Sequence, residues 1–205
     1  MTAVDDPVAA AAAATAWPEL AASVRTCVAC PELVEGRTQV VPGLAPPGAD
    51  LLLVGEAPGA QEDAVGVPFV GRAGQLLDGL LAEVGLARDR VGVANVLKCR
   101  PPANRKPRRA EVARCRPWLE RQIELLDPAF IVALGGTAAE WFLGPSARIA
   151  LLRGEVHSYD GRPLLVTYHP SAAIRFGPRG MPLAALREDL ARAAELLESL
   201  RRRTP

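Results

Sequence analysis

The sequence of 205 residues lacks a long hydrophobic run. A helix that spans a membrane needs about 20 mainly apolar residues in succession, and polar or charged residues interrupt every such window here. The first residues also lack the positive charge that begins a secretory signal, because Asp5 and Asp6 stand there instead. We therefore expect an intracellular, cytoplasmic protein with no membrane partner.

The sequence also lacks an excess of either charge, with 24 lysine and arginine residues against 23 acidic residues. This balance excludes a uniformly basic, histone-like protein and a disordered polyelectrolyte. The charges are nevertheless unevenly distributed. Residues 1–63 contain nine acidic and two basic residues, whereas residues 98–121 contain nine basic and two acidic residues. We expect this basic segment to contact an anionic partner.

Hydrophobic residues make up 49% of the chain, which is enough to form a core without disulfide bonds. The length fits one globular domain, which we place at residues 17–205. Residues 1–16 are rich in alanine and lack the regularly spaced large apolar side chains of a packed helix. A flexible chain and a loose helix therefore both stay open for this stretch.

Short apolar runs alternate with segments of helical periodicity along the rest of the chain. The runs predict strands at residues 51–54, 91–97, 130–134 and 164–166. The periodic segments predict helices at residues 76–84, 111–126, 137–143 and 183–200. A hairpin turn at Asp160-Gly161 comes before the last strand. The alternation predicts a three-layer α/β/α fold with a mainly parallel, four-stranded central sheet.

Polar side chains stand at the carboxyl ends of three predicted strands, where such sheets bind their ligands. Glu56 follows the first strand, Asn95 lies in the second, and His169 follows the fourth. A glycine-rich loop at residues 66–74 also contains Phe69, in a place that a core aromatic usually avoids. An aromatic ring in such a loop can stack on a planar ligand.

The chain contains four cysteines, of which Cys27 and Cys30 form a C-x2-C pair and Cys99 and Cys115 are separated by 15 residues. In a reducing compartment such a set indicates metal binding rather than disulfides. Zinc and iron–sulfur clusters both take four thiolates, and the spread second pair favours a cluster. The alternative is that Cys99 and Cys115 are small buried apolar residues.

Several segments of the chain together resemble a known family. They are the C-x2-C pair, GEAPG-x2-ED, PFVGRAGQLL, NVLKCRPP-x-NR, the fourth cysteine and YHPSAAIR, in this order. The same elements are found in the type 4 (iron–sulfur) uracil-DNA glycosylases, and the resemblance runs from Cys27 to the last helix. It implies the uracil-DNA glycosylase fold, a [4Fe–4S] cluster on Cys27, Cys30, Cys99 and Cys115, and a monofunctional enzyme of base excision repair. Such an enzyme hydrolyses the N-glycosidic bond of deoxyuridine in DNA, and we expect a monomer.

The resemblance also implies roles for individual residues. Asn95 reads the edge of uracil, Phe69 stacks on the base, and the main chain of Gly55 and Ala57 faces it. An asparagine amide offers one donor and one acceptor, which match uracil O4 and N3–H. The base must leave the duplex to reach a site at the end of a buried strand.

Glu56 and His169 are the expected catalytic residues. His169 stabilises the negative charge that develops on uracil O2, and Glu56 orders water and offsets positive charge on the sugar. The classical uracil-DNA glycosylases have a carboxylate where Ala57 stands here. The resemblance therefore identifies the base-binding residues more directly than the group that activates water.

Arg105, Lys106 and Arg175 are the expected contacts to DNA, single- or double-stranded. Ile174 is in the segment expected to enter the minor groove. A related branch traps uracil-DNA covalently through a histidine in the loop after the second strand, but residues 98–110 contain no histidine, so we expect turnover. The alternatives are an iron–sulfur protein that binds uracil-DNA without turnover and a zinc-bound nucleotide-binding protein.

Overall fold

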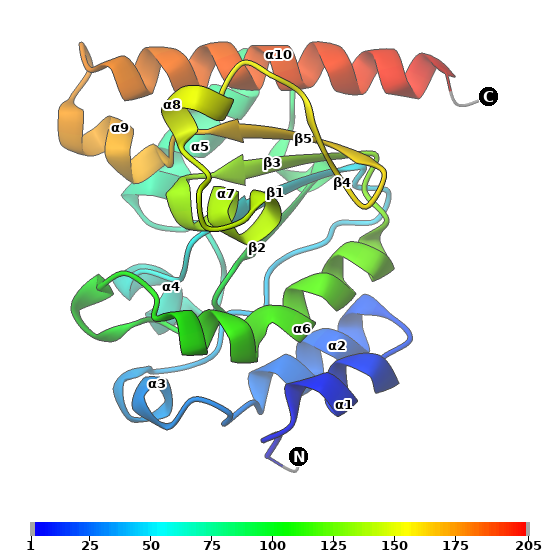
Figure 1. Ribbon diagram of the computed structural model, residues 1–205, viewed down its shortest axis with the longest axis vertical. Coiled ribbons are helices and arrows are strands. Elements are labelled where there is room, and N and C mark those ends of the chain that lie inside the picture. Colours follow the sequence, from blue (N-terminus) through cyan, green and yellow to red (C-terminus); the bar gives the residue numbers. More distant parts are fainter. Residues whose placement is uncertain (1–2, 204–205) are drawn as a thin grey trace.

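The structure is a computed structural model that describes residues 3–203. Its centre is a five-stranded sheet in the order β2-β1-β3-β5-β4 (Figure 1). Four of its strands are parallel, and β4 runs antiparallel to β5. The strands are β1 (Leu51–Gly55), β2 (Val91–Asn95), β3 (Phe130–Leu134), β4 (His157–Tyr159) and β5 (Arg162–Thr167).

The expected count of four strands was wrong, because β4 adds a fifth at the edge of the sheet. The sequence did signal the hairpin: Asp160 and Gly161 both have positive φ, at 49° and 77°, as a tight two-residue turn requires. The strand before the turn gave no signal of its own. It has only three residues, none of them fully buried, and it contains no apolar run.

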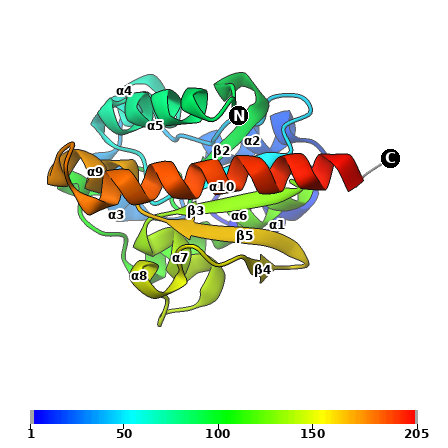
Figure 2. The same ribbon diagram turned by 90° about the horizontal axis from the view of Figure 1, so that it is seen from above.

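Helices cover both faces of the sheet, so the three-layer arrangement is confirmed (Figure 2). On one face, Leu51 and Leu53 of β1 pack with α5 (Arg72–Glu83) and α10 (Met181–Arg203). On the other face, Leu52 and Val54 pack with helices from the second half of the chain. These are α6 (Arg109–Leu126), α7 (Gly136–Leu143) and α8 (Ile149–Leu152).

A third cluster of buried residues lies at the end of the molecule opposite α10 (Figure 1). It joins α6 to three amino-terminal helices, with Trp118 fully buried among them. They are α1 (Pro7–Ala13), α2 (Trp17–Arg25) and α3 (Pro31–Gly36).

Of the two forms weighed for residues 1–16, the structure has a helix over Pro7–Ala13. Asp6 caps this helix, and the Arg121 guanidinium donates two hydrogen bonds to the carbonyl oxygen of Ala14, at 3.0 and 2.7 Å. Residues 1 and 2 lie outside the described part. The flexibility of this stretch and the domain boundary at residue 17 stay predictions.

The carboxyl ends of the parallel strands meet at one edge of the sheet, where Gly55 pairs with Asn95. The segments that leave this edge form α4 (Ala60–Val65), α9 (Pro170–Phe176) and the short turn η2 (Pro102–Asn104), whereas the short turn η1 (Arg88–Arg90) leads into the amino end of β2. Among the helices of the described residues, none combines the length and apolar character that crossing a membrane requires.

Two glycines of α5 give a test of this packing, because they differ only in their surroundings. A Cβ atom on Gly74 would overlap the carbonyl group of Phe69, whereas one on Gly79 would meet no atom within 4 Å. Gly79→Ala should raise the free energy of unfolding by about 0.5–1 kcal/mol, since alanine favours helix. Gly74→Ala should lower it by about 1–3 kcal/mol or more, since the backbone must shift. Urea denaturation measures both, and equal effects of the two changes would contradict this packing.

Candidate active site

A cleft of about 490 Å³ opens at the carboxyl edge of the sheet. Its walls come from the loops after β1, β2, β3 and β5. Seven of the nine residues expected to bind uracil or DNA or to act in catalysis line it: Glu56, Ala57, Phe69, Asn95, Arg105, His169 and Arg175. The other two, Gly55 and Lys106, do not line it. The fold therefore brings together residues that are up to 119 positions apart in the chain, from Glu56 to Arg175.

Asn95 ends strand β2 and is only 3% exposed. Its amide oxygen Oδ1 has no hydrogen-bond partner among the residues that the structure describes. A buried acceptor without a partner is unfavourable, by about 1–3 kcal/mol. Because Asn95 lines the cleft, a ligand with an N–H group can supply the missing donor.

Gly55 makes room for Asn95 and Phe69 without lining the cleft itself. A Cβ atom at this position would lie 2.5 Å from Asn95 Oδ1 and 2.6 Å from Phe69 Cζ. Phe69 has a φ of 54°, which is unusual for any residue other than glycine. Such strain persists where the surrounding structure enforces it, and it clusters at functional sites.

Two ring contacts hold the position of Phe69 within the cleft. Its ring centroid lies 5.8 Å from that of His169, with an angle of 32° between the planes. The Arg88 guanidinium lies over the ring, 5.9 Å from the centroid. Phe69 and His169 thus form two neighbouring parts of one wall.

Glu56 follows β1 and is half-buried. The Thr137 hydroxyl, near the start of α7, donates a hydrogen bond to Glu56 Oε2. Sequence reasoning did not single out Thr137. The available signal was its place two residues after Gly135, beyond the carboxyl end of β3, where the other strands carry their functional side chains.

Glu62 also lines the cleft, and its role in the structure is to hold two loops. Its carboxylate accepts hydrogen bonds from the main-chain N–H of Gly59, at 3.1 Å, and of Gly71, at 2.8 Å. One side chain thereby fixes the loop after Glu56 and the loop that carries Phe69.

His169 caps the amino terminus of α9. Its Nδ1 accepts a hydrogen bond from the Ser171 N–H at 3.1 Å and lies 2.8 Å from Ser171 Oγ. In a neutral imidazole with Nδ1 as acceptor, Nε2 carries the proton. Burial lowers the pKa of His169 to about 4, and the negative charge of Glu62 offsets only part of this effect. His169 is therefore a neutral donor at physiological pH.

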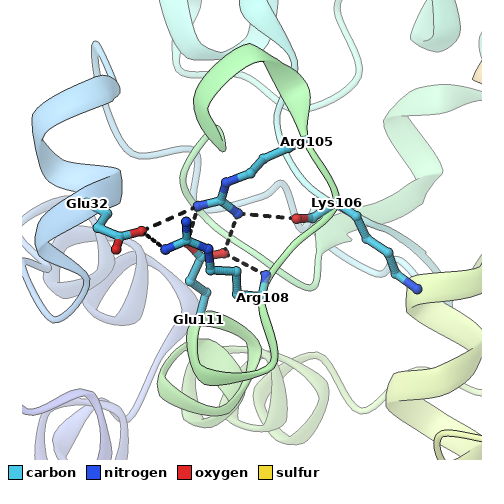
Figure 3. Close-up of polar contacts among 5 residues, drawn as sticks. All are labelled: Glu32, Arg105, Lys106, Arg108 and Glu111. Atoms are coloured by element: carbon cyan, nitrogen blue, oxygen red, sulfur yellow. Dashed lines mark hydrogen bonds and ion pairs between the residues drawn. The ribbon is translucent and has the colours of Figure 1, made fainter.

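The basic segment is paired with acidic residues from other elements (Figure 3). Arg105 donates two hydrogen bonds to the buried carboxylate of Glu111, at 2.6 and 2.9 Å, and its guanidinium lies 3.7 Å from Glu32. Arg108 pairs with Glu32, and the Arg108 N–H donates to Glu111 at 2.7 Å. The guanidinium of Arg105 holds the pKa of Glu111 below its usual value. Much of the positive charge counted in the sequence is therefore compensated within the fold.

The two other residues expected to contact DNA differ in whether their charge is paired with an acidic residue. Lys106 Nζ lies 3.3 Å from Glu140, whereas Arg175 is exposed and has no hydrogen-bond or ion-pair partner within the described residues. Ile174 is partly buried, and the exposed apolar side chain of this segment is Phe176, at 64%. Their roles toward DNA stay predictions.

The four cysteines line a second, small cavity that shares no lining residue with the cleft. Cys99 and Cys115 are buried, Cys27 and Cys30 are half-buried, and none forms a disulfide. Arg37 donates a hydrogen bond to Cys99 Sγ at 2.8 Å. Burial raises the pKa of Cys99 to about 11 and that of Cys115 to about 12.

Within residues 3–203, no three side chains of the metal-binding types gather closely enough to hold a single ion. A four-iron cluster is a cage that takes one thiolate on each iron, so its ligands surround a cavity rather than a point. The four thiols around this cavity therefore match the number and type of ligands that such a cluster takes.

Comparisons with known proteins agree with this fold and cleft. A profile of the uracil DNA glycosylase superfamily matches residues 42–191. A type-4 uracil-DNA glycosylase of Thermotoga maritima is 46% identical over 154 residues, which cover 74% of this chain and 80% of the relative. One of Sulfurisphaera tokodaii is 40% identical over 190 residues, covering 88% and 84%. A type-5 uracil-DNA glycosylase of Mycobacterium leprae is 33% identical over 223 residues, covering 89% and 96%.

The match over residues 42–191 thus places the chain in the uracil-DNA glycosylase superfamily, with which its α/β fold is consistent. The type-4 relatives match more closely than the type-5 relative over most of the chain. Within the superfamily, the chain belongs to the type-4 uracil-DNA glycosylases.

The lowered pKa of His169 predicts a pH-dependent contribution to stability. An unfolded histidine binds a proton near pH 6.5, whereas folded His169 does so only near pH 4. Between these values the unfolded state binds more protons, so stability falls as the pH falls. His169→Gln lacks this term. Between pH 7 and pH 4.5, the free energy of unfolding of the wild type should therefore fall by more than that of this variant. Urea titrations along this range measure it, and a constant difference would contradict the buried, neutral histidine.

Proposed function

We propose that the protein is a monofunctional uracil-DNA glycosylase of base excision repair. It takes deoxyuridine out of DNA and hydrolyses the N-glycosidic bond, leaving free uracil and an abasic site. The observation that carries this proposal is the buried Asn95 amide oxygen without a partner, in a cleft that also contains Phe69 and His169. Membership of the type-4 family supports the same activity.

The base is recognised through hydrogen bonds to its edge and through stacking. Uracil N3–H donates to Asn95 Oδ1, which satisfies the buried acceptor, and the amide N–H₂ donates to uracil O4. Cytosine has an acceptor at N3 and a donor at C4, so the same amide orientation rejects it. Phe69 stacks on the ring, and the main chain around Gly55 and Ala57 approaches its face.

The reaction breaks the bond between the sugar C1′ and uracil N1, and the bonding electrons leave with uracil. Negative charge then develops on uracil O2, and positive charge develops on the deoxyribose. The neutral His169 donates its Nε2–H to O2, in a geometry that Ser171 fixes through Nδ1. A neutral donor stabilises the leaving anion without transferring its proton.

Glu56 supplies the negative charge on the other side of the bond. Its carboxylate offsets the positive charge on the sugar and orders the water that adds to C1′. The proton that this water loses passes through the carboxylate to solvent, and the uracil anion takes up a proton from solvent. Thr137 occupies Oε2, and Oε1 has no partner among the described residues, so Oε1 is the atom that holds the water. Because Ala57 has no carboxylate, we assign this role to Glu56 alone.

The residues that would hold a [4Fe–4S] cluster are Cys27, Cys30, Cys99 and Cys115, and their shared cavity and free thiols support this. Bound there, the cluster would tie together segments that are far apart in the chain. These segments are the turn between α2 and α3, the loop after β2, and α6. We assign it a structural role, because its cavity and the cleft have no residue in common.

The DNA backbone binds at the mouth of the cleft, and the protein acts as a monomer. Arg175 is the best-supported phosphate contact, because it is exposed and unpaired among the described residues. Arg105 and Lys106 are engaged by Glu111 and Glu140, so a phosphate at these residues has to share the cation or displace the carboxylate.

The first experiment is incubation with an end-labelled oligonucleotide that contains one uracil, followed by a denaturing gel with and without alkali. We expect a shortened fragment only after alkali, because glycosylases of this kind leave the backbone intact. An unchanged strand would identify a binding protein without turnover. A slow band that survives denaturation would identify covalent trapping, which the loop without histidine argues against.

Asn95→Leu separates recognition from folding. We expect kcat/KM on uracil-DNA to fall at least about 100-fold, because the pocket loses the groups that pair with the base. The free energy of unfolding should stay unchanged or rise, since the variant removes a buried acceptor that has no partner. Single-turnover kinetics and urea denaturation measure the two effects. A marked loss of stability, or unchanged excision, would contradict the assignment of Asn95.

A further inference from the structure

Lys98 is a buried cation between the thiol cavity and the end of β2. It is one of two lysines in the chain and is only 1% exposed. Its ammonium donates hydrogen bonds to the Asn95 carbonyl oxygen at 2.6 Å and to Gln122 Oε1 at 2.5 Å. Gln122 in turn donates to the Pro42 carbonyl oxygen at 2.5 Å. One charged group thus connects the base-reading residue, α6 and the segment before β1.

Within residues 3–203, the charge of Lys98 has no carboxylate partner. Both of its acceptors are neutral, and a buried charge is costly unless an opposite charge lies near it. None of the residues that line the thiol cavity is acidic. The lining contains the four cysteines together with three cations, Arg37, Lys98 and Arg114. The groups of this cavity that can carry the negative charge to balance Lys98 are its thiols, of which Cys115 and Cys99 act on the ammonium.

We infer that Lys98 is a positioning residue, which takes the occupied thiolate centre as its counter-charge and holds the main chain of Asn95 in place for uracil. The inference rests on the function proposed above for the four cysteines and for Asn95. It connects two sites that have no lining residue in common. Four thiolates around metal, Cys99 among them, bring negative charge close to Lys98. This charge keeps the Lys98 ammonium in place.

The protein without metal in the thiol site should differ from the loaded protein at the end of β2. Without metal, Lys98 is a buried cation that only neutral groups surround, so a state in which it reaches water gains in stability. Its hydrogen bond to Asn95 is then lost, and the end of β2 becomes less ordered. Loading of the thiol site should therefore order a strand end outside the cavity.

The test uses the full chain, loaded with iron and sulfide or stripped by a chelator. Lys98→Met removes the charge and keeps an unbranched side chain. Arg192→Met removes an exposed charge of α10 and is the matched control. The first readout is the rate of iron loss to a chelator. We expect Lys98→Met to lose iron at least about tenfold faster than the wild type and the control, as for other groups that support metal ligands.

The second readout is hydrogen–deuterium exchange of residues 91–97. In the wild type and the control, loading should slow exchange in this segment. In Lys98→Met, loading should leave it unchanged, and KM for uracil-DNA should rise in the loaded fraction. Iron loss at the wild-type rate, or the same protection of residues 91–97, would overturn the inference.

Gln122→Leu keeps the ammonium and removes one of its acceptors, so it tests the inference even where Lys98→Met does not fold. This variant should retain iron like the wild type and lose part of the protection at residues 91–97. Iron loss with unchanged protection would contradict the positioning role. The wild type could retain iron, protect residues 91–97 when loaded, and still excise no uracil. That result would overturn the proposed function and leave the link between Lys98, the thiol site and the end of β2 intact.

Discussion

The pairing of β1 with β2 in one register is the constraint on which the site depends. It sets Gly55 directly beside Asn95, and the space left by the missing side chain admits both the Asn95 amide and the Phe69 ring. A shift by one residue would turn every side chain of a strand to the other face of the sheet. The neighbours of these two residues follow from the same register, since Glu56 comes next after β1 and the loop that carries Lys98 comes after β2.

A second organising feature is the way the fold distributes charge. The sequence concentrates basic residues in one segment, and folding brings Glu32 of the acidic segment to the arginines after η2, where Glu111 of the basic segment itself also pairs with Arg105. Around the thiol cavity the opposite arrangement is found, with cations and no acid among the lining residues. The molecule thus neutralises its surface loop internally and keeps one interior region positive, as a region that receives thiolates requires.

The sequence predicted the long helices, the parallel strands and the polar side chains at the strand ends because each has a strong local signal, but it gave no signal for the short helices α3, α4, α8 and α9. Buried strands are continuous apolar runs, and their carboxyl ends mark the site. It missed β4, which has three residues and exists through its pairing with β5. It assigned no role to Thr137, Glu62 or Lys98, because each acts through hydrogen bonds that form only once the chain is folded. The pairing of Arg105 with Glu111 depends on the conformation of the loop that carries Arg105, with positive φ at Ala103 and Asn104 just before it, and no residue pattern revealed it.

The strained backbone of Phe69 also limits how the sequence of such a protein can drift. Phe69 keeps its positive φ only while Gly55 leaves room for the ring and Gly74 leaves room for the carbonyl group. A Cβ atom at Gly55 would also meet the Asn95 amide, and one at Gly74 would meet the main chain of residue 69, which every amino acid has. Loss of the aromatic ring therefore frees neither glycine, and both should persist in descendants that have replaced Phe69 but keep Asn95 and this loop.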